Sequence, residues 1–295
     1  MRAFPPNRRR FLSLAAALLG AALAARRSAP VAAKARLSAQ GLLAVHRIVS
    51  FYGTPLAPGL GALGQGDPET MIGRLRAQAD AYAALDPERT VQPALHLIYE
   101  IAQAAPGADG LYLGRTPDAI VEEYIRLARD NGLLLFLDLQ LGRSTIEREV
   151  GAVARFLAEP NVHLALDPEF AWGPGVTPVE DIGFLRAAQV NQAQAMLQQI
   201  ATENGLPGKI LIVHQFRHGM LPDKAAIQPH EGVELVIDMD GFGSPAAKLD
   251  TYTAVITNDA VQYPGVKLFY EHDVPLMSPE DVLALWPRPV VVIYQ

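Results

Sequence analysis

Acidic and amide side chains stand in pairs, two residues apart, at the ends of short apolar runs. The pairs are Asp138 with Gln140, Asp167 with Glu169, and Asp238 with Asp240. Side chains two apart on a β-strand point to one face, so the two members of each pair are expected to project together. Carboxylates that gather at one place repel one another, and they require cations, shared protons or hydrogen-bond donors. This pattern predicts a site for acid–base catalysis or for a metal ion.

Eight apolar runs of strand length carry these pairs and set the expected fold. They cover residues 45–52, 92–101, 133–140, 162–169, 209–216, 233–240, 266–272 and 289–294. Helix signals separate most of them, with caps at Asp67, Thr116 and Ser278, a capping box at 144–147 and a long helical stretch at 179–204. This alternation predicts an α/β fold, a single (β/α)8 TIM barrel over residues 41–295.

A doubly wound open sheet is the rival architecture. The even spacing of the eight runs favours the barrel. The first run also lacks the Gly-x-Gly-x-x-Gly turn that is typical of dinucleotide-binding open sheets.

In a barrel of this kind, chemistry takes place where the strands run out into the following loops. Polar residues at those ends predict most of the substrate-binding set, which is Tyr52, Glu100, Asp138, Gln140, His214, Gln215 and Asp238. The apolar residues between the acids, such as Leu139 and Met239, suit the outward face. The acids themselves are therefore expected to face the barrel mouth. Acids near strand ends also cap helices or pair with Arg and Lys, which is the structural alternative for each of them.

The strand end Asp167-Pro168-Glu169 resembles that of several glycoside hydrolases with a TIM barrel, notably the chitinase-like clan. The resemblance implies that Glu169 is the general acid that protonates the leaving oxygen. Asp167 would assist it by raising its pKa. The chain departs from the clan's motif at three places: Ala165 and His163 stand where the clan has further acids, and Pro168 replaces the residue usual between the two acids.

The same resemblance implies partners for Glu169. Asp240, Tyr294 or Glu100 would supply the second catalytic role, as stabiliser, nucleophile or water-activating base. Trp172 and Tyr52 would stack on a sugar ring.

Binding of a divalent metal is the alternative use of these side chains. Candidate ligands are Asp138, Asp167, Glu169, His214 and Asp238, whose oxygen and imidazole atoms suit Mg²⁺, Mn²⁺ or Zn²⁺. A metal would relieve the crowding of negative charge and could activate water for ester or phosphodiester hydrolysis. The chain contains no His-x-His or His-Glu-x-x-His spacing, so no cofactor is assigned from the sequence.

Composition excludes several other classes of protein. The 295 residues are 50% hydrophobic, enough for one large core, and the net charge of -6 argues against a nucleic-acid partner. The absence of cysteine excludes disulfides, thiolate metal ligands and a cysteine nucleophile. The ligand implied by the resemblance to glycoside hydrolases is a small molecule or a saccharide.

Residues 1–25 resemble a twin-arginine export signal, with Arg8, Arg9, Phe11 and Leu12 at the characteristic positions. The following apolar run is too short to span a bilayer comfortably, and Ala22-Leu23-Ala24 offers a cleavage site. We expect export across the cytoplasmic membrane to the periplasm, cell wall or exterior, with the twin-arginine machinery as partner. An uncleaved membrane anchor is the alternative, and no other membrane partner is expected. Residues 26–40 are basic and rich in alanine, which predicts a disordered linker.

These observations predict an exported barrel hydrolase that resembles the glycosidases. A metal-dependent (phospho)ester hydrolase and a non-catalytic ligand-binding barrel are the two alternatives.

Overall fold

The computed structural model describes residues 41–259 and 262–295. The signal segment predicted at 1–25 and the linker predicted at 26–40 lie outside the described residues. No described helix combines the length and the apolar character that crossing a membrane requires.

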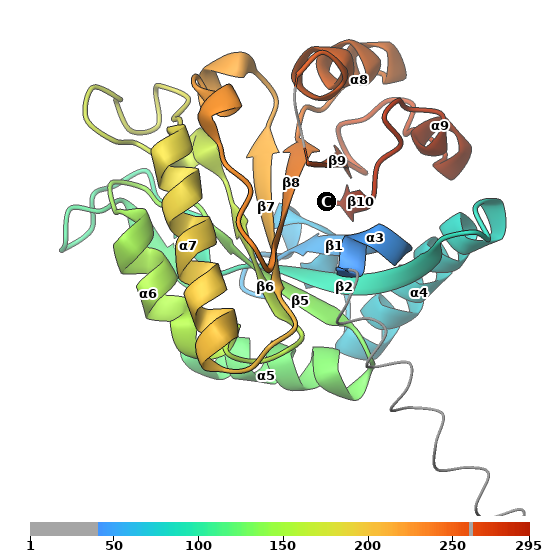
Figure 1. Cartoon of the computed structure of the whole chain (residues 1–295), viewed down its shortest axis with the longest axis horizontal. Coiled ribbons are helices and arrows are strands. Elements are labelled where there is room, and N and C mark those ends of the chain that lie inside the picture. The colour runs from blue at the N-terminus through green and yellow to red at the C-terminus, as the bar shows by residue number, and fades with distance from the viewer. Residues whose placement is uncertain (1–40, 260–261) are drawn as a thin grey trace, which may run out of the picture. The chain divides into compact units, whose positions relative to one another are not determined.

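Eight parallel strands close into a barrel, which confirms the predicted α/β TIM-barrel fold (Figure 1). In chain order they are β1 (His46–Gly53), β2 (Thr90–Ile98), β5 (Leu134–Leu139), β6 (Val162–Leu166), β7 (Lys209–Gln215), β8 (Val233–Met239), β9 (Tyr263–Leu268) and β10 (Val291–Tyr294). Each strand pairs with its neighbour in the chain, and β1 pairs with β10 to close the ring.

Helices follow most of the strands and lie outside the ring (Figure 1). They are α4 (Pro68–Leu85), α5 (Asp118–Asp130), α6 (Ile146–Leu157), α7 (Ala187–Glu203), α8 (Pro245–Tyr252) and α9 (Pro279–Leu283). As expected from its short length, the connection from β7 to β8 contains only two 3-10 turns among its described residues, at His218–Met220 and Lys224–Ala226.

Alternation along the strands divides the apolar residues into two cores. Outward-facing residues, among them Leu137, Leu139, Ile237 and Met239, pack against the helices. Inward-facing residues fill the lower half of the barrel, and Leu43 of the short helix α3 (Leu42–Val45) packs against them. Glu234 holds this helix by accepting hydrogen bonds from the backbone N–H groups of Leu42 and Leu43 at 2.8 and 2.9 Å. The barrel interior is therefore apolar at this end, and polar side chains gather at the other.

Several local expectations need correction. The second strand ends at Ile98, and Glu100 instead begins β3 (Glu100–Ala102), which forms an antiparallel hairpin with β4 (Leu113–Arg115). The fourth strand ends at Leu166, before a 3-10 turn over Pro168–Phe170. Proline has no N–H for the strand ladder, which accounts for the early end.

The long helix expected at 179–204 begins only at Ala187. Val179 adopts a φ of 71°, and Pro178 and Gly183 flank it, so the chain cannot be helical there. The end of the helix is as predicted, with Asn204 at the C-cap and Gly205 at a φ of 62°.

The capping box predicted at 144–147 does not form, and the N-cap lies one residue later than expected. Thr145, not Ser144, is the N-cap of α6, and its hydroxyl accepts a hydrogen bond from the backbone N–H of Arg148. Ser144 instead donates its hydroxyl to Glu149.

We expect Thr145→Ala to lower the free energy of unfolding by about 1 kcal/mol, because one N–H group at the start of α6 loses its acceptor. Urea denaturation of the purified protein measures this loss. Thr202→Ala is the control, since Thr202 is exposed inside α7 and bonds only the carbonyl of Gln198. The assignment of the N-cap is wrong if the two variants unfold at the same urea concentration.

Candidate active site

A chain of buried hydrogen bonds crosses the barrel just below its mouth. His214 of β7 lies between Asp138 of β5 and Asp238 of β8. Its Nε2 is 3.0 Å from Asp138 Oδ2, and its Nδ1 is 2.9 Å from Asp238 Oδ2. His96 of β2 adds a second bond to the same Asp138 oxygen at 3.0 Å. All four side chains are fully buried.

The hydrogen bonds fix the charge of His214. An ionised carboxylate only accepts hydrogen bonds, so an imidazole that bonds one through each nitrogen carries hydrogen on both and is a cation. Burial alone would lower the pKa of His214, but Asp138 and Asp238 raise it well above its usual value. Burial alone would likewise raise the pKa of Asp138, but the bonds from His214 and His96 hold it well below its usual range.

Lys267 of β9 is a second buried cation in the mouth. Its Nζ lies 3.3 Å from the carboxylate of Asp240, and it also lies 3.7 Å from the centre of the Tyr52 ring. Burial alone would lower the pKa of Lys267. The charges of Asp240, Asp167 and Asp138 outweigh burial, so the pKa of Lys267 is raised. His214 and Lys267 together supply the cations that the crowded acids were expected to require.

Glu169 differs from the other acids of the mouth. Within the described residues its side chain has no hydrogen-bond or ion-pair partner, and it is partly exposed to the cavity. Burial is the main cause that raises the pKa of Glu169, and the charge of Asp240 is the second. Asp167 accepts a hydrogen bond from the Glu169 backbone N–H at 3.2 Å, which fixes the turn that carries Glu169. Burial also raises the pKa of Asp167 well above its usual value.

A cavity of about 590 Å³ opens above this layer. Its polar lining includes Tyr52, Gln140, Asp167, Glu169, Asp240 and Lys267. Its apolar lining includes Leu60, Ile98, Phe216, Phe242 and Phe269. Leu60 belongs to the 3-10 turn Pro58–Leu60, in the glycine-rich segment after β1. A concave site with apolar walls and a few converging polar groups is the usual form of a small-molecule site.

Three of the predicted site residues face away from this cavity. Tyr294 points outward, and its hydroxyl lies 2.8 Å from that of Tyr82 and 2.9 Å from Gln78 Nε2. Gln215 also points outward and accepts a bond from Lys224 Nζ at 3.0 Å. The placement of both follows from strand alternation, because each stands one position past an inward-facing residue.

Glu100 is the third of these residues and lies in the hairpin formed by β3 and β4. Its carboxyl group is beside Arg115, at 3.5 Å, and beside Glu149 of α6. Burial, followed by Glu149, raises the pKa of Glu100 to about 10. Glu100 therefore helps to hold the hairpin against α6 and does not line the cavity.

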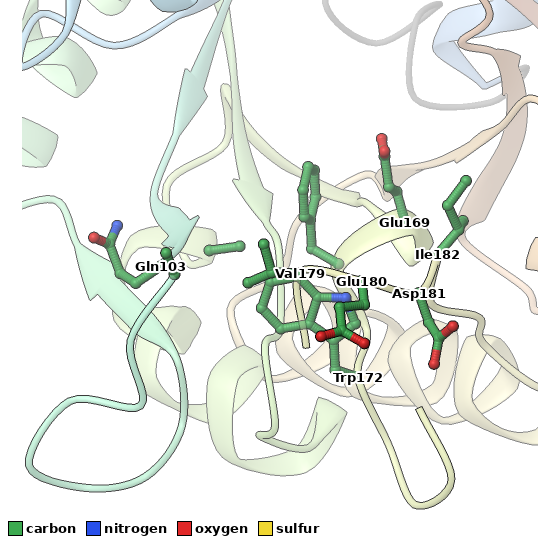
Figure 2. Close-up of a pocket in the computed structure, with 10 residues that line it drawn as sticks. Gln103, Glu169, Trp172, Val179, Glu180, Asp181 and Ile182 are labelled. Carbon is green, nitrogen blue, oxygen red and sulfur yellow. The ribbon is translucent and has the colours of Figure 1, made fainter. Parts of the chain in front are cut away.

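Trp172 lines a smaller pocket of about 210 Å³ that meets the main cavity at Glu169. Figure 2 shows this pocket, with Trp172 on one side and the Glu169 carboxyl group pointing away from it. Asp138, His214 and Asp238 lie below the main cavity, so they shape its charge without lining it.

Lys267 is the site residue that sequence reasoning missed. The predicted site residues are mainly acids and histidines at strand ends, whereas Lys267 lies inside an apolar run between Val266 and Leu268. A lysine at such a position must be paired or neutral. The presence of a lysine within an apolar strand therefore indicates a buried acidic partner.

Two groups of side chains among the described residues have the spacing of metal ligands. They are His96, Asp138 and His214, and His214, Asp238 and Asp240. Both require His214, which already donates from both ring nitrogens and has no lone pair to offer. The donor set therefore fits an internal ion network better than a metal, and we assign no metal ligands.

Comparison with known proteins returns no family and no curated relative. No protein-family model matches the chain, and no curated protein matches its sequence. Among solved structures, the barrel is similar to the Bacillus subtilis mannanase man26, at 13% identity and a TM-score of 0.39 over 74% of each chain. It is also similar to the Bacillus subtilis mannanase BCman, at 12% identity and a TM-score of 0.38 over 74% of each chain. Likeness at this level carries no argument about activity, so the function must be inferred from the site.

We expect His214 to remain protonated at about pH 8 and His163 to remain neutral at about pH 5. Asp138 and Asp238 raise the pKa of His214, whereas burial and Lys209 lower that of His163 well below its usual value. A raised folded-state pKa means that the stability from His214 is complete below its unfolded pKa. That stability is lost as the pH rises through the folded value. Imidazole ¹⁵N chemical shifts measure both states, and a His214 signal that titrates near its unperturbed value would contradict the ion network.

Proposed function

We propose that the barrel hydrolyses a glycosidic bond, with Glu169 as the general acid. The observation that carries the proposal is the contrast between Glu169 and its neighbours. Among the described acids that line the main cavity, Glu169 alone is partly exposed, unpaired and raised in pKa. A carboxyl group with a raised pKa keeps its proton to higher pH than an exposed one and can donate it to a leaving oxygen.

Asp240 is proposed for the second role. It lines the same cavity and lies 3.3 Å from Lys267 and 3.7 Å from His214. Burial raises the pKa of Asp240, but these two cations lower it. Burial outweighs the cations, so the pKa of Asp240 is raised on balance. The two cations nevertheless favour its ionised form, whereas Glu169 has no cation at bonding distance. Two carboxyl groups that face one cavity in different protonation states are what glycoside hydrolysis requires.

The proposed reaction balances with these two groups. Glu169 donates its proton to the glycosidic oxygen as the bond from that oxygen to the anomeric carbon breaks. As a base, Asp240 takes a proton from the water whose oxygen bonds to the anomeric carbon. As a nucleophile, Asp240 bonds to that carbon itself, and water then hydrolyses the resulting ester with Glu169 as the base. Tyr52 and Gln140 line the same cavity and are proposed to contact sugar hydroxyls. Lys267 favours the ionised form of Asp240.

The cellular location belongs to the same proposal. The arginine pair at Arg8 and Arg9, followed by Phe11 and Leu12, supports export through the twin-arginine route. A saccharide polymer or oligomer outside the cytoplasm is accordingly the proposed substrate.

The first test of this function is the dependence of Glu169→Gln on the leaving group. A panel of aryl glycosides and oligosaccharides, including mannan and chitosan fragments, identifies the sugar that the wild-type protein cleaves. We expect Glu169→Gln to reduce kcat/KM for the oligosaccharide by about 10²- to 10⁴-fold. The loss should be far smaller for the 2,4-dinitrophenyl glycoside of the same sugar, because that leaving group departs without a proton.

Glu271→Gln is the matched control, since Glu271 is exposed outside the main cavity. We expect it to retain wild-type rates on both substrates. Equal losses on both substrates in Glu169→Gln would remove Glu169 from the role of general acid. Saccharide binding with no hydrolysis in the wild-type protein would instead identify a ligand-binding barrel. Cleavage of phosphodiesters that disappears with a chelator would identify the metal-dependent alternative.

A further inference from the structure

The smaller pocket beside Glu169, here called the outer pocket, has a structure of its own. Its lining residues include Gln103, Ala104, Trp172, Val179, Glu180 and Ile182 (Figure 2). Ala102, Glu169 and Phe170 line both the outer pocket and the main cavity. Glu169 therefore stands at the boundary between two hollows. The outer pocket has a volume of about 210 Å³, which corresponds to about seven water molecules at roughly 30 Å³ each. This volume suits one monosaccharide unit.

A buried polar group in the outer pocket lacks a partner. The indole Nε1 of Trp172 is buried and, within the described residues, forms no hydrogen bond. Figure 2 shows the nitrogen edge of the indole on the side of Glu180, within the set of residues that line the pocket. An indole N–H can only donate, so the group that would satisfy it is an acceptor such as a sugar hydroxyl oxygen.

Strained backbone surrounds the same tryptophan. Three non-glycine residues in the described ranges have a positive φ, namely Tyr112 at 59°, Leu141 at 52° and Val179 at 71°. Tyr112 packs edge-on against Trp172, with ring centres 6.1 Å apart, and Val179 lines the outer pocket. Leu141 precedes Gly142, whose carbonyl accepts the Trp172 backbone N–H at 2.7 Å. Strain of this kind persists where the surroundings impose it and gathers at binding sites.

We infer that the outer pocket is the subsite for the leaving group, which places one sugar unit on each side of Glu169. A general acid must reach the oxygen that joins the two parts of its substrate. Glu169 lines both hollows, and its carboxyl group points away from the outer pocket. The main cavity would hold the sugar that is attacked, and the outer pocket would hold the unit released with the protonated oxygen. The substrate class is then an oligosaccharide or polysaccharide cut between two units, and not a glycoside of a small alcohol. This inference rests on the proposed function of Glu169.

The test fills the outer pocket without touching the main cavity. Ala104 is exposed and lines only the outer pocket, so Ala104→Trp should occupy it while the fold is retained. We expect kcat/KM for an oligosaccharide of the cleaved sugar to fall by about tenfold or more, which is typical of a lost pocket contact. The glycosyl fluoride of the same sugar, whose leaving group is a single small atom that places nothing in the outer pocket, should change by less than about threefold.

Ala108→Trp is the matched control, because Ala108 is exposed in the same hairpin loop but does not line the pocket. It should leave both substrates at wild-type rates. Trp172→Phe removes the N–H and keeps an aromatic ring, and it should also reduce the rate for the oligosaccharide alone.

Equal effects of Ala104→Trp on both substrates, or none on either, would overturn the subsite. Those outcomes are independent of the general acid, because Glu169→Gln is read from the difference between good and poor leaving groups. If Glu169→Gln lacks that difference, the proposed function fails whatever the outer pocket does.

Discussion

The mouth of this barrel depends on one buried cation, the imidazolium of His214 between Asp138 and Asp238. Both aspartates are fully buried, and such charges are tolerated only when they are paired and hydrogen-bonded. His214 meets that condition for both with bonds of 2.9 and 3.0 Å. Without it, β5 and β8 would each end in an uncompensated buried carboxylate. The polar layer would then be a source of repulsion instead of a rigid floor.

The two acids Asp240 and Glu169, which line the main cavity above this polar layer, differ in their partners. Lys267 pairs with Asp240 and leaves Glu169 without a partner. The main cavity thus faces two acids whose pKa burial raises, one paired with a lysine and one without a partner. This difference in pairing comes from three neighbouring side chains, and it is the basis of the proposed acid–base hydrolysis.

The fold was predictable because its signals are local. Strand-length apolar runs, the cap at Asp67 and the helix end at Asn204-Gly205 each specify a short segment, and together they define the barrel. Strand alternation also predicted which acids face the mouth. The same rule, applied to Tyr294 and Gln215, would have turned both outward, since Ile293 and His214 occupy the inward positions. The roles of Glu100 and Lys267 depend on tertiary contacts that the sequence does not show. Glu100 lies in a hairpin outside the barrel, and Lys267 is paired with Asp240 of another strand.

The stability of His214→Leu tests the central claim most directly, because this change removes both hydrogen bonds and the positive charge. The account predicts that the free energy of unfolding, measured by urea denaturation at about pH 7, falls by about 3–5 kcal/mol, the cost of leaving buried charges unpaired. His230→Leu, on a partly exposed histidine whose Nδ1 contacts only the Gln228 carbonyl among the described residues, should leave the free energy of unfolding nearly unchanged. A loss of less than about 1 kcal/mol in His214→Leu, the size typical of an exposed ion pair, would contradict the account.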